Sequence, residues 1–324
     1  MKAVVLVGGE GTRLRPLTLT TPKQMLPVGG RAMIERVLGW LAGHGIDEAV
    51  LSLGYRPDAF LKAYPDGECA GVRLHYAVED SPLDTAGAIR FAAVEGGVSE
   101  TFVVVNGDVL TGLDVTALVR FHRDRGAEAT IALTPVEDPS AFGVVPTRED
   151  GQVTAFIEKP PRDQAPTNLI NAGTYVLEPS VLQRIPSGRR VSIERETFPA
   201  LVAEGRLFAM GSDAPWLDAG TPGAYLAANL AYAPHGPRSW EGGGEARASV
   251  VGEDVTVGPG ALVERCVVMD GVQVGEGAVV TDSVLGPGAR IGAGARVENL
   301  SVIGDEWMVE AGAVLSGARL PAPA

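Results

Sequence analysis

The last quarter of the chain places an apolar residue at every sixth position, and this period restricts the possible folds more than any other feature. The repeat keeps its phase over twelve positions, with a step of five residues at two places: Val251, Val257, Val263, Val268, Val274, Val280, Leu285, Ile291, Val297, Ile303, Val309 and Leu315. A hexapeptide repeat of this kind indicates a parallel β-helix of roughly four triangular coils, each of which buries its apolar corners against its neighbours. A disordered tail rich in glycine and valine would not hold one phase for so long.

Before this repeat, apolar runs alternate with helical patterns. Strands are expected at 3–7, 49–53, 72–78, 102–105, 130–133, 153–157 and 173–177, and helices at 33–41, 57–64, 85–94, after Asp114, at 194–203 and at 222–232. This alternation predicts an α/β, Rossmann-like domain with a mostly parallel sheet, whose ligands bind beyond the carboxyl ends of the strands. The stretch 233–248 has the proline and glycine content of a linker. The predicted parts are therefore a domain over 1–232, a linker over 233–248 and a left-handed β-helix over 249–318.

The first strand opens into a glycine-rich, cationic loop. Ala3–Val7 is a short apolar run, and it ends at Gly8 and Gly9. Glycines allow the backbone to approach a ligand closely, and the arginines and lysine that follow add positive charge, which suits a polyphosphate. The stretch fits neither the Walker A pattern, because no lysine follows a glycine here, nor G-x-G-x-x-G, because Leu14 stands at the last glycine.

Composition excludes several classes of partner. The formal net charge is −13, which opposes binding to nucleic acid or to an anionic membrane. Cys69 and Cys266 are far apart in sequence, so neither a disulfide framework nor a zinc site is expected. The apolar start is too short for a signal peptide, and no segment reaches the roughly 18 apolar residues of a membrane span. We therefore expect a cytoplasmic protein that binds phosphates through local basic groups and a divalent cation.

Six short stretches, in this order, resemble the sugar-1-phosphate nucleotidylyltransferases. They are GGEGTR at 8–13 with Lys23, PLDTAGAI at 82–89, NGD at 106–108, FGVV at 142–145, FIEKP at 156–160 with INAGTYVL at 170–177, and WLDAGTP at 216–222. FIEKP and the segment RVSIERETFPAL at 190–201 are most similar to members that use GTP and mannose-1-phosphate. The loop departs from the family pattern at Gln24, where proline is common, and at Arg31-Ala32, where Lys-Pro is common.

The resemblance implies nucleotidyl transfer. A phosphate oxygen of the sugar-1-phosphate would attack the α-phosphorus of the nucleoside triphosphate and expel pyrophosphate. Since the attacking phosphate is already ionised near neutral pH, the task is positioning and charge neutralisation rather than base catalysis. The residues that match the family's catalytic groups are Arg13 and Lys23, which would hold the triphosphate, and Asp108 and Asp218, which would bind Mg²⁺.

The resemblance also implies two sets of binding residues. Those expected to bind the nucleotide are Leu6, Gly8, Gly9, Gly11, Thr12, Arg13, Lys23, Glu79, Ala86, Gly87 and Asp108. Those expected to bind the sugar phosphate are Gly143, Glu158, Lys159, Asn171 and Gly173. The loop from Glu79 to Gly87 would read the base, although Asp84 stands where some guanylyltransferase relatives have glycine.

Three other interpretations remain open at the level of the sequence. One is a glucose-1-phosphate nucleotidylyltransferase that uses UTP, dTTP or ATP. Another is a non-catalytic, nucleotide-sugar-sensing homologue, although the predicted catalytic residues are all present. The third makes the coils an acyltransferase, but related acyltransferases use a histidine in the coils and none follows His235. The coils are therefore expected to be structural, and their exposed ends predict a homo-oligomer, a dimer or larger.

Overall fold

The chain forms two compact units in the computed structural model, which describes residues 1–322. Unit 1 comprises Met1–Gly9 and Ile34–Trp216, and unit 2 comprises Glu10–Met33 and the chain from Leu217 onward. In the described part of the chain, no helix is both long enough and apolar enough to cross a lipid bilayer.

Unit 1 is built on one sheet of ten strands, in the order β11-β10-β12-β7-β1-β4-β6-β5, with β9 and β13 joined beside β12. Strands β6, β4, β1 and β7 are parallel, whereas β12 runs antiparallel to β7. The chain passes from β1 outward to β6 and then returns to β7 on the other side of β1, so ligands are expected beyond the carboxyl end of β1. The strands are β1 (Lys2–Leu6), β4 (Glu48–Leu53), β5 (Glu68–Cys69), β6 (Val72–Val78), β7 (Phe102–Asn106), β8 (Val109–Thr111), β9 (Ala129–Pro135), β10 (Gly143–Val144), β11 (Ile157–Glu158), β12 (Leu169–Leu177) and β13 (Leu207–Gly211). Strand β14 (Trp216–Asp218) begins at the last residue of unit 1 and continues into unit 2.

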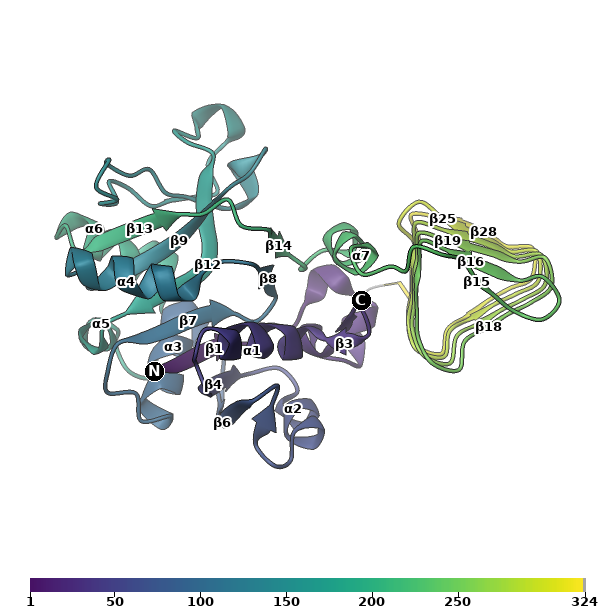
Figure 1. Cartoon of the computed structure of the whole chain (residues 1–324), viewed down its shortest axis with the longest axis horizontal. Coiled ribbons are helices and arrows are strands. Elements are labelled where there is room, and N and C mark those ends of the chain that lie inside the picture. The colour runs from purple at the N-terminus through teal and green to yellow at the C-terminus, as the bar shows by residue number, and fades with distance from the viewer. Residues whose placement is uncertain (323–324) are drawn as a thin grey trace. The chain divides into compact units, whose positions relative to one another are not determined.

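Helices cover this sheet, and Figure 1 shows α1 and α4 on the viewer's side of it. Val4 and Val104 point to the core that also contains Ile89 of α3 and Phe198 of α6. Asp114 caps α4 as predicted, because its Oδ1 accepts a hydrogen bond from the backbone N–H of Ala117 at 2.9 Å. The helices are α1 (Met33–Gly43), α2 (Pro57–Ala63), α3 (Asp84–Glu95), α4 (Val115–Arg125), α5 (Pro179–Arg184), a π-helical turn (Ile193–Thr197) that runs into α6 (Phe198–Ala203), and 3₁₀ turns at Pro139–Ala141 and Arg162–Gln164.

Two strand predictions were wrong in their bounds. The strand expected at 153–157 is reduced to β11, because Val153 makes only an isolated bridge with Thr147. Strand β12 begins at Leu169 rather than at Gly173, so Asn171 lies in the strand and not in a loop. The register of β12 against β9 shifts between Asn171 and Tyr175. The alternation of apolar and polar residues therefore does not continue along the whole strand, and its first half was not recognised. Strand β13 was not predicted at all.

Unit 2 combines the glycine-rich loop, one helix and the coils. The loop carries three 3₁₀ turns, Thr12–Leu14, Leu17–Leu19 and Lys23–Met25, followed by the short antiparallel strands β2 (Pro27–Val28) and β3 (Arg31–Ala32). Helix α7 (Pro222–Leu230) begins at its cap Thr221, whose side chain accepts from Ala224 N–H. Helix α7 holds the end of the loop, since Asn229 Oδ1 accepts from the N–H of Gly29 at 3.0 Å and the Tyr225 hydroxyl donates to the carbonyl of Pro27.

The coils form a parallel β-helix, as the hexapeptide period predicts, and Figure 1 shows them nearly end-on as stacked triangles. Three parallel sheets make the sides of the triangle. The core is lined by the predicted apolar positions, among them Val263, Val280 and Val297, each fully buried. The strands are β15 (Arg238–Ser239), β16 (Glu245–Arg247), β17 (Val250–Val251), β18 (Thr256–Val257), β19 (Leu262–Glu264), β20 (Val267–Val268), β21 (Gln273–Val274), β22 (Val279–Thr281), β23 (Val284–Leu285), β24 (Arg290–Ile291), β25 (Arg296–Glu298), β26 (Val302–Ile303), β27 (Met308–Val309), β28 (Val314–Ser316) and β29 (Arg319–Leu320).

The ladder of coils starts inside the stretch that the sequence predicts as a linker. Strand β16 already pairs in parallel with β19, and β15 adds an antiparallel strand beside β16. Trp240 packs against the core of the coils, and its indole N–H donates to the carbonyl of Val255 at 2.9 Å. The amino-terminal end of the β-helix is therefore covered by the chain's own residues.

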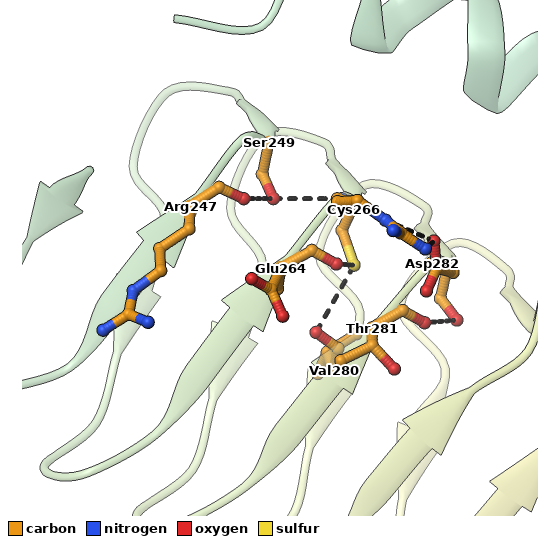
Figure 2. A network of polar contacts seen from close by, with 9 residues as sticks. Arg247, Ser249, Glu264, Cys266, Val280, Thr281 and Asp282 are labelled. Carbon is orange, nitrogen blue, oxygen red and sulfur yellow. Dashed lines mark hydrogen bonds and ion pairs between the residues drawn. The ribbon is translucent and has the colours of Figure 1, made fainter. Parts of the chain in front are cut away.

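One corner of the triangle carries a column of small polar side chains, part of which is shown in Figure 2. The hydroxyl of Ser249 donates to the carbonyl of Arg247 at 2.8 Å and accepts from the N–H of Cys266, one coil later, at 2.9 Å. The thiol of Cys266 in turn approaches the carbonyl of Glu264 at 3.1 Å. The column continues through Ser283 and Ser301. Each of these small polar residues follows a residue with a positive φ, a backbone conformation that lets the chain turn sharply. The four residues with a positive φ are Ala248, Arg265, Asp282 and Leu300.

Candidate functional site

The glycines after β1 allow two loops to pack backbone against backbone. Gly8 follows β1 and lies beside Gly54, which follows β4. A Cβ atom at Gly54 would lie 3.0 Å from the carbonyl oxygen of Gly8, and one at Gly8 would lie 3.4 Å from the amide of Gly54. The contact at Gly54 is tighter than an ordinary Cβ contact, so a side chain there would press on the backbone of the Gly8 loop. The carboxyl end of β1 is thus left with bare backbone, as the sequence predicts for a phosphate-binding loop.

The carboxylate of Glu79 organises the neighbouring loop. Its Oε1 accepts from the Ser52 hydroxyl at 2.9 Å, and its Oε2 accepts from the N–H of Leu83 at 3.0 Å. A Cβ atom at Gly8 would lie 3.6 Å from Oε1, so this carboxylate stands next to the glycine loop. Glu79 therefore ties the predicted base-reading loop to strand β4 and to Gly8.

The start of α3 is hydrogen-bonded to the beginning of the RVSIERETFPAL segment, a contact that the sequence did not predict. The amides of Ala86 and Gly87 both donate to the carbonyl of Val191, at 2.9 and 3.2 Å, and a Cβ atom at Gly87 would lie 3.0 Å from the carbonyl oxygen of Arg189. These two amides are consequently used within the protein. Asp84, the first residue of α3, has a φ of 61°, and its Oδ1 accepts from the N–H of Thr85 at 2.8 Å.

The turn that carries Asp108 is fixed against β1 and β12. The amide of Gly107 donates to the carbonyl of Leu6 at 2.9 Å, which places this turn beside the end of β1. On the other side, Gly173 of β12 has a φ of 72°, and a Cβ atom there would lie 2.6 Å from Nδ2 of Asn106. The missing side chain at Gly173, a residue predicted to bind the sugar phosphate, leaves room for Asn106 at the end of β7.

The residues predicted for the sugar phosphate come together on strands β10, β11 and β12. Gly143 pairs with Glu158, and a Cβ atom at Gly143 would lie 3.2 Å from the Glu158 carboxylate and 2.6 Å from the ring of Phe156. Lys159 has a φ of 49°, its amide donates to the carbonyl of Phe142 at 3.0 Å, and its Nζ lies 3.5 Å from Glu158 Oε1. The Lys159 side chain is 60% exposed, so its ammonium group is accessible to a ligand, and its role in binding the sugar phosphate stays a prediction.

Asn171 is held by a tyrosine that the sequence did not single out. Its Nδ2 donates to the hydroxyl of Tyr175 at 2.9 Å, and its Oδ1 accepts from the N–H of Gly173 at 3.0 Å. Burial, together with the nearby Glu194 carboxylate, raises the pKa of Tyr175, so the phenol stays neutral. A second missed residue, Trp216, donates from its indole N–H to the carbonyl of Ala172 at 2.9 Å. The sequence could have indicated Tyr175 and Trp216, because they are aromatic residues with a polar group inside the INAGTYVL and WLDAGTP motifs, and such residues need a polar partner when buried.

The glycine-rich loop of unit 2 closes on itself. Gly11 has a φ of 64°, and its carbonyl accepts from the Thr18 hydroxyl at 2.8 Å and from the N–H of Leu14 at 2.9 Å. A Cβ atom at Gly11 would lie 2.9 Å from Cγ2 of Thr18 and 3.2 Å from Cβ of Lys23. Gly11 thus brings Lys23 beside the turn that begins at Thr12, and no larger residue would allow this.

The guanidinium of Arg13 meets the WLDAGTP motif within unit 2. Its Nη2 lies 3.9 Å from Oδ2 of Asp218, and the Arg13 side chain is 62% exposed. Asp218 Oδ1 accepts from the N–H of Gly220 at 2.8 Å. A Cβ atom at Gly220 would lie 2.6 Å from Arg13 Nη2 and 2.7 Å from Asp218 Oδ1. Gly220 therefore leaves space for an exposed cation and a carboxylate to stand side by side.

The predicted metal site has a suitable donor set. Magnesium is commonly bound by one or two protein carboxylates together with substrate phosphates, so Asp108 and Asp218 would suffice with a triphosphate present. Within residues 1–322 no group of three or more histidine, cysteine, aspartate and glutamate side chains is arranged to hold a metal ion. Asp108 lies in unit 1 and Asp218 in unit 2, and their joint role stays a prediction.

A mostly parallel sheet with bare glycine backbone after its first strand, and a separate loop that presents an arginine beside an aspartate, are features of α/β transferases that act on phosphates. The family described as nucleotidyl transferase matches residues 2–234, and the chain belongs to this family. A second description, GMPPB C-terminal domain, matches residues 246–323, which cover the coils.

Curated relatives and solved structures are similar to this chain over between two thirds and nearly all of its length. The chain is 47% identical over 223 residues to a mannose-1-phosphate guanylyltransferase of Mycobacterium tuberculosis, a match that covers 68% of this chain and 61% of that relative. It is 38% identical over 333 residues to a probable mannose-1-phosphate guanylyltransferase 3 of Oryza sativa, covering 94% of this chain and 91% of the relative. Among solved structures, HddC from Yersinia pseudotuberculosis complexed with GMP-PN has a TM-score of 0.62 and 27% identity, over 71% of this chain and 99% of HddC.

Proposed function

We propose that this protein transfers a guanylyl group from GTP to mannose-1-phosphate, giving GDP-mannose and pyrophosphate. The observation that carries the proposal is the similarity over nearly the whole chain to a relative named for that reaction, with 94% of this chain and 91% of the relative covered. Relatives of higher identity that carry the same name support it, although the chain matches only 61 to 64% of their own length.

The residues divide the work between two substrates. Arg13 and Lys23 would hold the triphosphate, while the backbone of Gly8, Gly9 and Gly11 would contact its oxygens. Glu158 and Asn171 would bind sugar hydroxyls, and Lys159 the sugar phosphate. The fixed positions of these groups matter more than their basicity, because the reaction depends on in-line placement and on neutralising charge in the transition state. Leu6, Thr12, Glu79, Ala86 and Gly87 would shape the nucleotide site from behind.

A magnesium ion bound by Asp108 and Asp218 would supply charge neutralisation at the phosphates. The chain's own contribution is to keep both carboxylates oriented. The turn of Asp108 is tied to Leu6 by the amide of Gly107, and the Asp218 carboxylate is tied to the amide of Gly220.

The experiment is a matrix of nucleoside triphosphates against sugar phosphates. Pyrophosphate release is measured for GTP, UTP, dTTP, ATP and CTP with mannose-1-phosphate and with glucose-1-phosphate, with and without Mg²⁺. We expect the highest kcat/KM for GTP with mannose-1-phosphate and no turnover after chelation. Turnover restricted to glucose-1-phosphate would favour the alternative enzyme, and no turnover with any pair would favour a nucleotide-sugar sensor.

We propose a homo-oligomer, because strands β27, β28 and β29 each lie at the edge of one sheet of the coils, and parallel edge strands offer unpaired backbone groups. Light scattering at micromolar concentration should show at least a dimer, and a monomer would contradict this. The cytoplasmic location stays a prediction from the sequence.

A further inference from the structure

The last two coils of the β-helix contact the glycine-rich loop directly. Unit 2 contains both segments, which are almost 300 residues apart in the chain: the hydroxyl of Thr20 donates to Oδ2 of Asp305 across 285 positions. Nη1 of Arg319 donates to the carbonyl of Arg13 at 3.1 Å. Pro16 packs on Gly304, where an added Cβ atom would lie 3.1 Å from its ring. All three contacts fall on the loop between Arg13 and Thr20.

Asp305 can bind the loop because the preceding coil has a proline at the position that would otherwise donate a backbone N–H to its carboxylate. The equivalent residue two coils earlier is Asp270, whose Oδ1 accepts a hydrogen bond from the N–H of Glu253 in the coil before it, at 2.8 Å. The residue that stands in the place of Glu253 beneath Asp305 is Pro287, which has no N–H. The carboxylate of Asp305 therefore turns to Thr20 instead of to its own coil, and burial raises its pKa.

Arg319 also departs from the pattern of its column. Strand β29 continues the sheet in which Val250, Val267, Val284 and Val302 stand one above the other. The last coil has an arginine at this position. The Arg319 guanidinium donates to the backbone carbonyl of Arg13, whose side chain is proposed to hold the triphosphate. This hydrogen bond therefore fixes the backbone of Arg13.

The coil between Val284 and Val302 has one extra residue and makes a further contact. In the sheet of β17, β20, β23, β26 and β29, paired residues are seventeen positions apart except Val284 and Val302, which are eighteen apart. The other two sheets show the same extra residue between Arg290 and Met308 and between Arg296 and Val314. Two consecutive residues there, Asn299 and Leu300, have a positive φ. A Cβ atom at Gly223 of α7 would lie 3.6 Å from Leu300 Cδ2. Helix α7 also holds the far end of the loop at Pro27 and Gly29, so coils and helix together support the loop at both ends.

We propose that the last two coils are a brace that positions the triphosphate-binding loop, with Asp305 and Arg319 as positioning residues that act through Thr20 and Arg13. This rests on the proposed function only in taking Arg13 to be a triphosphate ligand. The β-helix would then affect how well the enzyme binds GTP while supplying no group to the chemistry.

The test compares Asp305→Ala, Arg319→Ala and Thr20→Val with the wild type in the full chain. Loss of one hydrogen bond is worth about 0.5–1.5 kcal/mol, so each variant should raise the KM and the Kd for GTP by roughly 2- to 13-fold. The KM for mannose-1-phosphate and the melting temperature should change little. The double variant Thr20→Val with Asp305→Ala should be no worse than either single variant, because both remove the same contact. Asp305→Asn keeps an acceptor oxygen and should restore GTP binding.

Matched controls lie on the same β-helix. Asp270→Ala removes the equivalent carboxylate two coils earlier, and Arg296→Ala removes an exposed arginine whose ion pair with Glu298 is local. Both should leave the KM for GTP unchanged. Trypsin offers a readout independent of turnover, since a loosened loop should be cut faster after Arg13 in the Asp305→Ala and Arg319→Ala variants.

The outcomes separate the two proposals. If Arg13→Ala weakens GTP binding while Asp305→Ala and Arg319→Ala do not, the brace is refuted and the proposed function stands. If Arg13→Ala itself leaves the Kd for GTP unchanged, the role proposed for Arg13 is refuted. If Asp270→Ala raises the KM for GTP as much as Asp305→Ala does, the effect comes from general weakening of the coils and the brace is again refuted.

Discussion

Gly173 offers a sharp test of how β12 shapes the site, because one added methyl group would act on two properties at once. Its φ of 72° is costly for any residue with a Cβ atom, by about 1–2 kcal/mol, and the reduced entropy of the unfolded chain returns about 0.4–1 kcal/mol. Gly173→Ala should therefore lower the free energy of unfolding by about 1 kcal/mol from the backbone alone.

The second effect is steric and concerns the turn of Asp108. The new Cβ atom would lie 2.6 Å from Nδ2 of Asn106, whereas ordinary contacts begin at 3.4 Å, so the amide must retreat by about 0.8 Å. Asn106 stands two residues before Asp108. Since a misplacement of about 1 Å near the reacting groups can cost about a hundredfold, we expect kcat to fall between about 10- and 100-fold.

Gly126→Ala is the matched control for this prediction. Gly126 has a φ of 56° at the end of α4, and an added Cβ atom would meet nothing within 4 Å. Urea unfolding should give both variants a similar loss of stability, while pyrophosphate release at saturating GTP and mannose-1-phosphate should drop only for Gly173→Ala. Wild-type kcat in Gly173→Ala, or an equal loss of kcat in Gly126→Ala, would refute the reasoning.

Three further predictions concern buried groups and the coil corners. Burial lowers the pKa of His122, so the unfolded chain takes up a proton first as the pH falls through about 6.5; the free energy of unfolding should decrease there, and less so in His122→Gln. Burial raises the pKa of Cys69 to about 11 and that of Cys266 to about 12, so a thiol reagent at pH 8 should modify neither in the native protein and both in urea. Ala248 has a φ of 43°, so Ala248→Gly should raise the unfolding free energy by about 1 kcal/mol in a urea titration, and a loss of stability would contradict the corner geometry.

The sequence predicts most of the fold because its two periods are strong. Val72–Val78 was predicted with the bounds that β6 has, and the hexapeptide phase placed the core of the coils down to Val297. Where prediction failed, the backbone departs from regular pairing. Strand β12 has a register shift next to Gly173, and the alternation of apolar residues is interrupted there.

The candidate site was predicted less completely, for a different physical reason. Motif spacing identified Asn171 and Glu158, but it could not show that Tyr175 holds Asn171 or that the amides of Ala86 and Gly87 are used by Val191. Such contacts join residues that lie far apart in the chain or that only a bulge brings together. A single sequence contains the partners without indicating that they meet.

The regular spacing of the coils also determines how far the last coils lie from helix α7. Each coil adds one strand spacing, about 4.8 Å, along the axis. Deleting one whole coil of seventeen residues would preserve every pairing within the stack, yet it would move Asp305 and Arg319 by that distance relative to α7. No hydrogen bond can span such a step. If the last two coils brace the loop, the number of coils must match the position of the loop, and a chain shortened by one coil should fold and bind GTP more weakly.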